Sequence, residues 1–174
     1  HADPTLAETL TMTAQSSNIV GEVVPNPAEP PRDCPLCPRL VAYRRENQDL
    51  YPDWFNGPAP SFGDRNARLL VVGLAPGRKG ANRTGRPFTG DYAGTLLYET
   101  LIKFGFATGQ FEARPDDSLK LIDAAVTNAV RCAPPGNKPE TSEENACRPF
   151  LKARLEMFPN LKVIVTLGDV SRRN

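Results

Sequence analysis

Short apolar runs that alternate with helix-like segments constrain the fold of this chain most strongly. Residues 69–72, 124–130 and 163–167 are runs of small, branched or apolar residues, of the length expected for buried strands. Between the first two runs, residues 92–104 carry leucines and a phenylalanine at helical spacing, followed by a glycine. Strand, loop and helix in alternation predict parallel strand pairing, and therefore an α/β sandwich.

Two further helices are expected. Residues 40–50 have helical spacing, and another helix is placed from about Arg148 to Phe158. The second helix is started there because Pro149 suits the first helical position and is awkward inside a helix.

A proline-rich stretch precedes the first of these helices. Residues 25–38 contain six prolines, which exclude a continuous helix or a central strand. We therefore predict an extended or poorly ordered segment over residues 1–32. The rest, residues 33–174, is long enough for one folded domain with its own core.

The net charge is only +1, so the overall charge does not indicate a nucleic-acid partner. Charge is concentrated locally, since one acidic residue and six basic residues lie between positions 64 and 86. Such a cluster suits a surface that faces phosphates, and it equally suits a solvated loop. The basic residues are Arg65, Arg68, Arg78, Lys79, Arg83 and Arg86.

Targeting signals are missing from the sequence as given. No apolar run approaches the roughly 20 residues that a membrane helix needs. Residues 1–17 lack the basic start and apolar centre of a signal peptide. We therefore expect a cytoplasmic protein with no membrane partner, whose cysteines stay reduced.

The four cysteines fall into two pairs. Cys34 and Cys37 have the C-x2-C spacing of a metal or cluster half-site, whereas Cys132 and Cys147 are widely spaced. Four thiols suit tetrahedral zinc and a four-iron cluster about equally well. Two unrelated pairs of thiols are the remaining alternative, although a proline-flanked C-x2-C is poor core sequence.

A long glycine-rich loop follows the first strand and extends from Gly73 to Asp91. Its glycines permit close approach of the backbone to a ligand. In parallel sheets, functional loops lie beyond the carboxyl ends of the strands, and this loop and residues 128–132 both fall there. A phosphate-binding P-loop is a poor match, because Gly73 and Gly77 are too close and Gly80 follows Lys79.

Several separated motifs resemble those of one enzyme family. Gly73-Leu-Ala-Pro-Gly77, followed by Asn82-Arg-Thr-Gly-Arg-Pro-Phe-Thr-Gly-Asp91, resembles the first signature of the family 5 (type b) uracil-DNA glycosylases. Thr127-Asn-Ala-Val-Arg-Cys132 resembles their second signature. The resemblance extends from about Asp33 to Gly168. The related family 4 has a glutamate where this chain has Leu74, which favours family 5.

The resemblance implies a fold, a cofactor and an activity. The fold is a three-layer α/β/α sandwich around a parallel four-stranded sheet. The cofactor is a structural [4Fe–4S] cluster, with zinc as the alternative, and its ligands are Cys34, Cys37, Cys132 and Cys147. The activity is hydrolysis of the N-glycosidic bond of uracil in DNA, and of hypoxanthine or other deaminated bases, by a monomer that leaves an abasic site.

Candidate site residues also follow from the resemblance. Phe88 is expected to be a stacking platform for the flipped base, although a core phenylalanine is the ordinary interpretation. Asn128 can donate and accept towards the edge of uracil, or it can bond its own backbone in a turn. Backbone N–H groups near Gly73, Leu74 and Ala75 are expected to stabilise the base oxygens.

Asp91 is the candidate for positioning water or supporting a cationic sugar. Many relatives place an aspartate or asparagine in the first loop for this purpose, and Leu74 and Ala75 cannot do so. Asp91 also directly precedes the helix expected from Tyr92, which is an ideal N-cap position. One residue can serve both roles.

The family's last signature, a loop with a base-contacting histidine, is not found in this sequence, whose single histidine is His1. We expect it beyond Asn174, together with the fourth strand, so that the domain is truncated at its C-terminus. A catalytically weak or inactive, metal-stapled DNA-binding fragment is therefore the alternative function.

Overall fold

The computed structural model describes residues 28–168. Most predicted elements are present within one residue or two of their expected bounds. In chain order the elements are α1 (Pro38–Leu50), β1 (Phe62–Gly63), β2 (Leu69–Gly73), α2 (Ala81–Thr84), α3 (Tyr92–Lys103), β3 (Ala107–Thr108), β4 (Lys120–Leu121), β5 (Ala124–Asn128), a 3-10 turn (Pro135–Asn137), α4 (Thr141–Glu156) and β6 (Val163–Thr166).

The main sheet has the strand order β1-β5-β2-β6. Strand β2 is central and pairs in parallel with β5 and β6, as the alternation of strands and helices predicts. These are the three strands of the expected parallel set that fall within the described residues, and the short strand β1 is added to them antiparallel to β5. Gly63 permits this close pairing, since a Cβ there would lie 2.5 Å from the Ala124 carbonyl oxygen.

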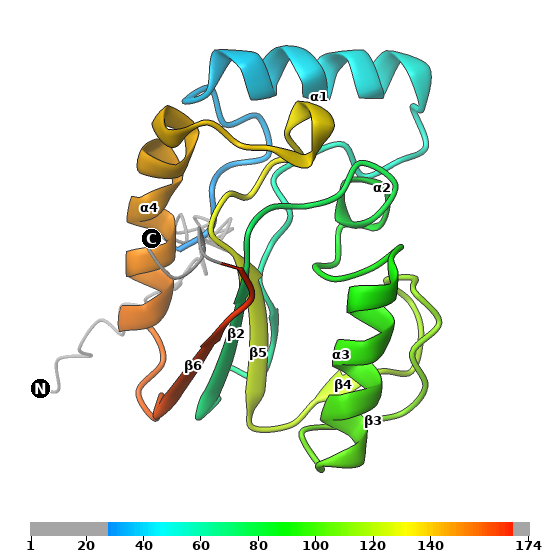
Figure 1. The fold of residues 1–174 in the computed structure, drawn as a ribbon, viewed down its shortest axis with the longest axis vertical. Helices are drawn as coiled ribbons and strands as arrows, with labels where there is room; N and C mark the ends of the chain where they lie inside the picture. The colour runs from blue at the N-terminus through cyan, green and yellow to red at the C-terminus, as the bar shows by residue number, and fades with distance from the viewer. Residues whose placement is uncertain (1–27, 169–174) are drawn as a thin grey trace, which may run out of the picture.

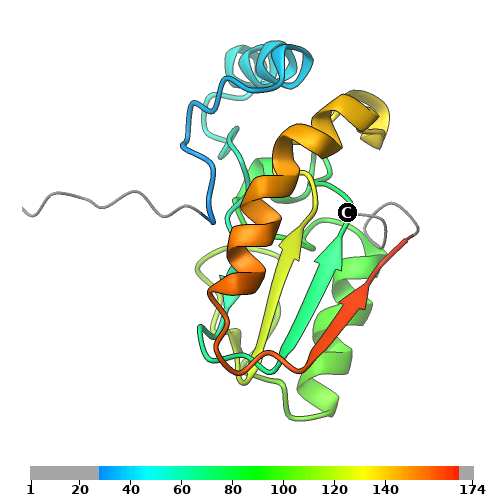
Figure 2. The ribbon, with the colours of Figure 1, turned by 90° about the vertical axis from the view of Figure 1, so that its left-hand side faces the viewer.

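Helices cover both faces of this sheet, so the predicted α/β/α sandwich is confirmed. Figure 2 shows α4 in front of the strands and α3 behind them. Side chains alternate along β2 accordingly. Val71 packs with Tyr98 of α3, whereas Leu70 and Val72 pack with Leu151 of α4. Helix α1 lies across the top of the sheet in Figure 1, beyond the carboxyl ends of the strands.

Helix α4 begins about two turns earlier than the sequence predicts. Glu140 and Glu143 form a capping box at its N-terminus, and Pro149 lies inside the helix. Arg39 of α1 donates to both carboxylate oxygens of Glu143, at 2.8 and 2.7 Å. These contacts fix the start of the helix and outweigh the cost of an interior proline, about 3 kcal/mol.

The segment before α1 packs against the domain from Ala28 onward. Ala28 is fully buried, and the carboxylate of Glu29 accepts hydrogen bonds from Arg131 and Arg154. Packed structure thus begins five residues before the boundary placed at Asp33, and residues 1–27 lie outside the described part. The expected histidine loop, fourth parallel strand and truncated C-terminus lie outside it too. None of the helices described is long and apolar enough to cross a bilayer.

Candidate active site

A cleft opens at the carboxyl ends of β2, β5 and β6. Its volume is about 150 Å³. All six residues proposed from the sequence for catalysis or base binding line it, from three separate stretches of the chain. The lining residues are Gly73, Leu74, Ala75, Pro76, Gly77, Ala81, Phe88, Thr89, Asp91, Ala93, Asn128 and Leu167.

Gly73 brings the two sides of this cleft together. It is the last residue of β2 and is in register with Asn128, the last residue of β5. A Cβ at position 73 would lie 2.6 Å from the Asn128 Oδ1 atom and 2.6 Å from the Phe88 Cζ atom. Glycine is therefore required for the ring and the amide to approach each other across β2.

Phe88 has an unusual backbone conformation for a bulky residue. Its φ is +57°, in the left-handed region that costs non-glycine residues free energy. The side chain is half-buried and packs against the core between the sheet and α3. It also lines the cleft, so the core and platform interpretations each describe part of its surroundings.

Asn128 is buried, with 3% of its surface exposed. It is the last residue of strand β5, and Ala129, directly after it, donates its N–H to the Gly73 carbonyl at 2.9 Å. Asn128 therefore lies in a paired strand and not in a turn. Its amide carries both donors and acceptors, and this strand end fixes it at the cleft wall.

Asp91 is the N-cap of α3, as predicted. Its Oδ1 atom accepts the Gly94 N–H at 2.8 Å. The residue is exposed at the rim of the cleft. Capping fixes one carboxylate oxygen near the helix N-terminus, where negative charge is favoured, and the carboxylate remains at the cleft.

The basic cluster of residues 65–86 is divided by the fold. Arg68 pairs with Asp123 at the opposite end of the sheet, and Arg86 is buried against Asp117. A single phosphate-facing patch is therefore wrong. Three basic residues remain in the loop beyond β2 or in α2, the stretch that also supplies Gly77 and Ala81 to the cleft: Arg78, Lys79 and Arg83.

Arg78 lies against an aromatic pair. Its guanidinium donates to the Tyr51 hydroxyl at 2.9 Å and lies over the Tyr51 ring. The Tyr51 and Trp54 rings stack with centroids 4.0 Å apart. Cation and rings together form a surface that suits a nucleic-acid strand.

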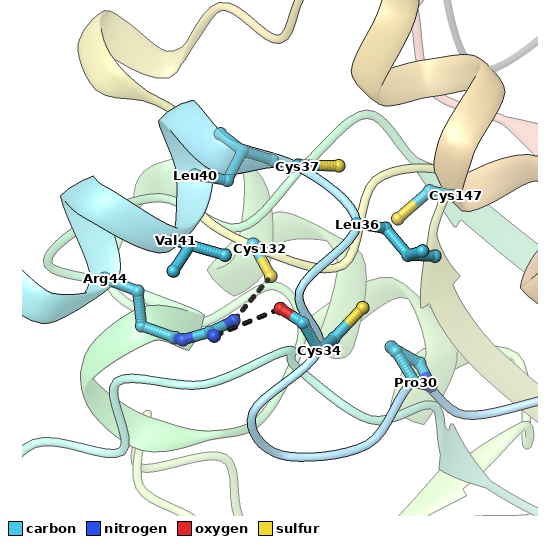
Figure 3. A pocket seen from close by; sticks show the side chains of 9 residues that line it. All are labelled: Pro30, Cys34, Leu36, Cys37, Leu40, Val41, Arg44, Cys132 and Cys147. Atoms are coloured by element: carbon cyan, nitrogen blue, oxygen red, sulfur yellow. Dashed lines mark hydrogen bonds between the residues drawn. The ribbon is translucent and has the colours of Figure 1, made fainter.

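The four cysteines line a separate pocket between α1, α4 and the end of β5. Figure 3 shows their side chains around one common space, with Leu36 at its edge. Cys37 is the N-cap residue of α1, Cys147 lies in α4, and Cys132 follows β5. The two sequence pairs therefore line one pocket, although they are remote from each other in the sequence.

Burial and mutual repulsion raise the pKa of three of these thiols, those of Cys37, Cys132 and Cys147. Desolvation raises the pKa of Cys132 to about 12 and that of Cys37 to about 11, and it also raises the pKa of Cys147. Arg44 opposes the shift at Cys132, because its Nη1 atom lies 3.7 Å from the sulfur. A bound metal centre would supply the positive charge that the buried thiolates need.

Comparison with known proteins assigns the family. The model described as "Uracil DNA glycosylase superfamily" matches residues 60–174. The chain belongs to the uracil DNA glycosylase superfamily. Figure 1 shows that the matched region contains the whole main sheet together with α3 and α4.

Two similar members of the superfamily are named Type-5 uracil-DNA glycosylases. The one from Thermus thermophilus is 46% identical over 144 residues, which cover 79% of this chain and 65% of the relative. The one from Pyrobaculum aerophilum is 39% identical over 145 residues, 81% of this chain and 64% of the relative. A Type-4 uracil-DNA glycosylase from Pyrobaculum aerophilum is 31% identical over 143 residues, 82% of this chain and 59% of the relative. The predicted resemblance to family 5 is confirmed, and the chain spans about two-thirds of the length of these Type-5 relatives.

Six cleft residues of this uracil DNA glycosylase superfamily member were not predicted as site residues: Pro76, Gly77, Ala81, Thr89, Ala93 and Leu167. Thr89 and Ala81 line the cleft beside Phe88, and Leu167 closes it from the end of β6. Leu167 could have been found by the rule that parallel strands end at the same edge, applied to all three strands instead of two. Nothing in the sequence marks Ala81, because its place depends on how the loop closes on itself.

Proposed function

We propose that this chain is a uracil-DNA glycosylase, which hydrolyses the N-glycosidic bond of uracil in DNA and leaves an abasic site. One observation carries the proposal: the Phe88 ring and the Asn128 amide meet across Gly73 in a cleft that also contains Asp91. A flat apolar face, a donor–acceptor group and a carboxylate are what excision of a pyrimidine requires. The names of the Type-5 relatives support the same substrate.

Base flipping is the step that delivers uracil to the cleft. A base inside a duplex is inaccessible, and unstacking it costs a few kcal/mol. Phosphate contacts near the cleft would hold the strand during flipping. Arg78, Lys79 and Arg83 supply the positive charge, and the stacked pair of Tyr51 and Trp54 supplies an aromatic surface beside it.

Recognition then depends on the two residues that meet across Gly73. The Phe88 ring stacks on the flat face of uracil. The Asn128 amide donates to a carbonyl oxygen and accepts from the imide N–H of the base. Other deaminated bases such as hypoxanthine present a similar carbonyl and N–H edge, so we propose that they are weaker substrates.

Bond cleavage leaves positive charge on the sugar and negative charge on the departing base. Backbone N–H groups near Leu74 and Ala75 stabilise the base oxygens from the wall of the cleft. The Asp91 carboxylate at the rim stabilises the sugar cation and orients the attacking water. No further group with this charge lines the described cleft.

A [4Fe–4S] cluster is the cofactor that we propose for the cysteine pocket, with Cys34, Cys37, Cys132 and Cys147 as ligands. The donor set fits, because four thiols from three separate parts of the chain line one pocket whose other walls are mainly apolar. Within residues 28–168, no three Cys, His, Asp or Glu side chains form a group suited to a single metal ion. Hydrolysis needs no redox step, so the role of the bound cluster would be structural. It would crosslink α1, α4 and the segment that follows β5.

Abasic-site formation tests the proposed activity. The chain is incubated with a duplex containing one uracil, and with the same duplex containing thymine, before alkaline cleavage. We expect a break at uracil alone. Binding of the duplex without any break would instead support an inactive DNA-binding fragment. Size-exclusion chromatography with light scattering tests the monomer that we propose.

Iron and sulfide analysis tests the proposed cofactor. We expect a brown protein with broad visible absorbance and about four iron and four sulfide per chain. Cys147→Ala should lose both colour and iron. A colourless protein with one zinc per chain would contradict the cluster.

A further inference from the structure

Phe88 occupies a conformation that its surroundings must impose. A φ of +57° costs a bulky residue on the order of 1–3 kcal/mol, and it persists only where neighbouring contacts over-determine it. The residues on both sides of Phe88 are buried: Arg86 is 4% exposed and Thr89 is 3% exposed. Contacts of the surrounding residues must therefore fix the turn formed by residues 86–89.

A buried ion pair anchors the turn on one side. The two terminal nitrogens of Arg86 donate to the two carboxylate oxygens of Asp117, both at 2.7 Å. The side chains of Arg86 and Asp117 are 4% and 0% exposed. The guanidinium lies 5.2–5.6 Å from the ring centroids of Phe62, Tyr98 and Phe111. A planar guanidinium held at two points and surrounded by rings has little freedom to rotate or shift.

Asp117 is itself fixed in place. Its carboxylate also accepts backbone N–H groups of Glu112 at 2.8 Å and of Leu119 at 3.1 Å. The loop between β3 and β4 is thereby folded around one carboxylate, and the position of that carboxylate determines where the Arg86 side chain can reach. The Arg86 guanidinium holds the pKa of Asp117 well below its usual range, at about 2.

The backbone next to Phe88 is held on its other sides. The Tyr98 hydroxyl donates to the Pro87 carbonyl at 2.7 Å, and the Thr89 hydroxyl donates to the Arg86 carbonyl at 2.9 Å. A Cβ at Gly94 would lie 2.0 Å from the Phe88 carbonyl oxygen, so α3 presses directly on this turn. Tyr98 contacts both the Arg86 guanidinium and the Pro87 carbonyl, and so joins the two sets of contacts.

We propose that Arg86 and Asp117 are positioning residues, whose buried ion pair fixes the turn that presents the Phe88 ring to the base cleft. This inference rests on the proposed function, because it assigns the pair a role in presenting the stacking platform. A buried ion pair is often no more stabilising than apolar residues of similar volume, whereas it does fix geometry. Neither residue touches the base.

The test separates positioning from stability. In Arg86→Met/Asp117→Asn the pair is removed without leaving a buried charge, and the asparagine keeps a side-chain oxygen that can accept a backbone N–H of the β3–β4 loop, so the variant should fold with an unfolding midpoint near that of the wild type. Arg68→Met/Asp123→Asn is the matched control, since it removes an Arg–Asp pair at the opposite end of the sheet. Arg86→Lys, which keeps the charge and loses the two-point contact, is the second variant if the double variant does not fold.

Two readouts are compared. The first is 19F NMR of 4-fluorophenylalanine incorporated at position 88, recorded with and without free uracil. The second is single-turnover excision of uracil from a duplex, where a misplacement of about 1 Å can cost on the order of 10²-fold. We expect the pair variant to broaden the 19F line, to lose its response to uracil and to slow excision at least tenfold. The control should match the wild type in both.

A pair variant, or Arg86→Lys, with a wild-type 19F line and wild-type response to uracil would overturn the proposal. A loss of excision that only follows the fraction unfolded would overturn it as well. A wild-type chain that forms no abasic sites would refute the proposed function instead, and the 19F comparison would still decide whether the pair positions Phe88.

Discussion

At the scale of single residues, the cleft depends on the absence of one side chain. Gly73 allows the Phe88 ring and the Asn128 amide to approach across β2, because a Cβ there would lie 2.6 Å from both. Neither neighbour can withdraw easily. Asn128 is the end of a paired strand, and Phe88 lies in a turn that is fixed by surrounding contacts.

Gly73→Ala should therefore lower uracil excision by about 10²-fold, because the methyl group displaces the ring or the amide. The measurement is the single-turnover rate on a uracil-containing duplex. Gly57→Ala is the control, because a Cβ at position 57 would lie 3.1 Å from the nearest atoms of Arg32 and Phe55, which are outside the cleft. If Gly73→Ala excised uracil as fast as the control, the ring and amide would not form the binding site.

Two substitutions at Asp91 separate its capping role from catalysis. Serine is also a good N-cap, so Asp91→Ser should keep the free energy of unfolding within about 0.5 kcal/mol, whereas Asp91→Ala should lose about 1 kcal/mol. If the carboxylate also acts in the reaction, both variants should excise uracil at least 10²-fold more slowly. Urea unfolding and single-turnover kinetics measure the two effects. Unchanged excision in Asp91→Ser would leave only the cap.

The candidate site was largely predictable from the sequence, because its residues lie in motifs at the ends of strands. Gly73, Phe88, Asp91 and Asn128 all line the cleft as expected. Leu167 was missed, because it lies in an ordinary apolar run with no polar group to mark it. The division of the basic cluster was not predictable, since the partners Asp117 and Asp123 are remote in sequence from Arg86 and Arg68.

At the scale of helices and strands, contacts between segments remote in the sequence determine helix boundaries and strand pairings that the local sequence pattern does not predict. Pro149 suggested a late start for α4, yet Arg39 of α1 holds Glu143 in the first turn of the helix. Strand β1 is only two residues long, and its antiparallel pairing with β5 has no periodic signal in the sequence. The alternation of longer strands and helices was sufficient to predict the sandwich. Both faces of β2 carry apolar side chains, so a helix must cover each face.

The contact between the N-terminal segment and the sheet is another remote contact with a measurable energy. Glu29 pairs with Arg131 at 2.8 Å and with Arg154, and the Arg131 side chain is fully buried. Glu29→Gln would leave two largely buried guanidinium groups without a counter-charge, so it should lower the free energy of unfolding by about 3–5 kcal/mol.

Urea unfolding measures this loss, with Glu112→Gln as the control, because its pair with Arg114 is exposed and worth at most about 1 kcal/mol. Equal losses in the two variants would show that the Glu29 contacts do not anchor the segment.

At the scale of the whole molecule, the same carboxylate that anchors the Phe88 turn makes stability depend on acidity. The pKa of Asp117 lies at about 2, below its ordinary 3.8, because Arg86 and two backbone N–H groups stabilise the charged form. A depressed pKa contributes stability above the ordinary pKa and loses it as the pH falls towards the folded-state value. The wild type should lose about 2 kcal/mol from this group between about pH 5 and about pH 2.

Urea unfolding across this pH range, in the wild type and in Asp117→Asn, measures that contribution. The variant is less stable at neutral pH, and its free energy of unfolding should fall less on acidification, by about 2 kcal/mol. Parallel curves for the two proteins would contradict a lowered pKa of Asp117 in the folded state.

We propose that the cleft between Phe88 and Asn128 excises the base, and Asn128→Ala removes the amide that would recognise it. Single-turnover cleavage of a uracil-containing duplex and the dissociation constant for the same duplex are measured in parallel. We expect excision to fall by about 10²–10³-fold, with DNA affinity within a few-fold of the wild type. Excision at the wild-type rate in Asn128→Ala would contradict the account.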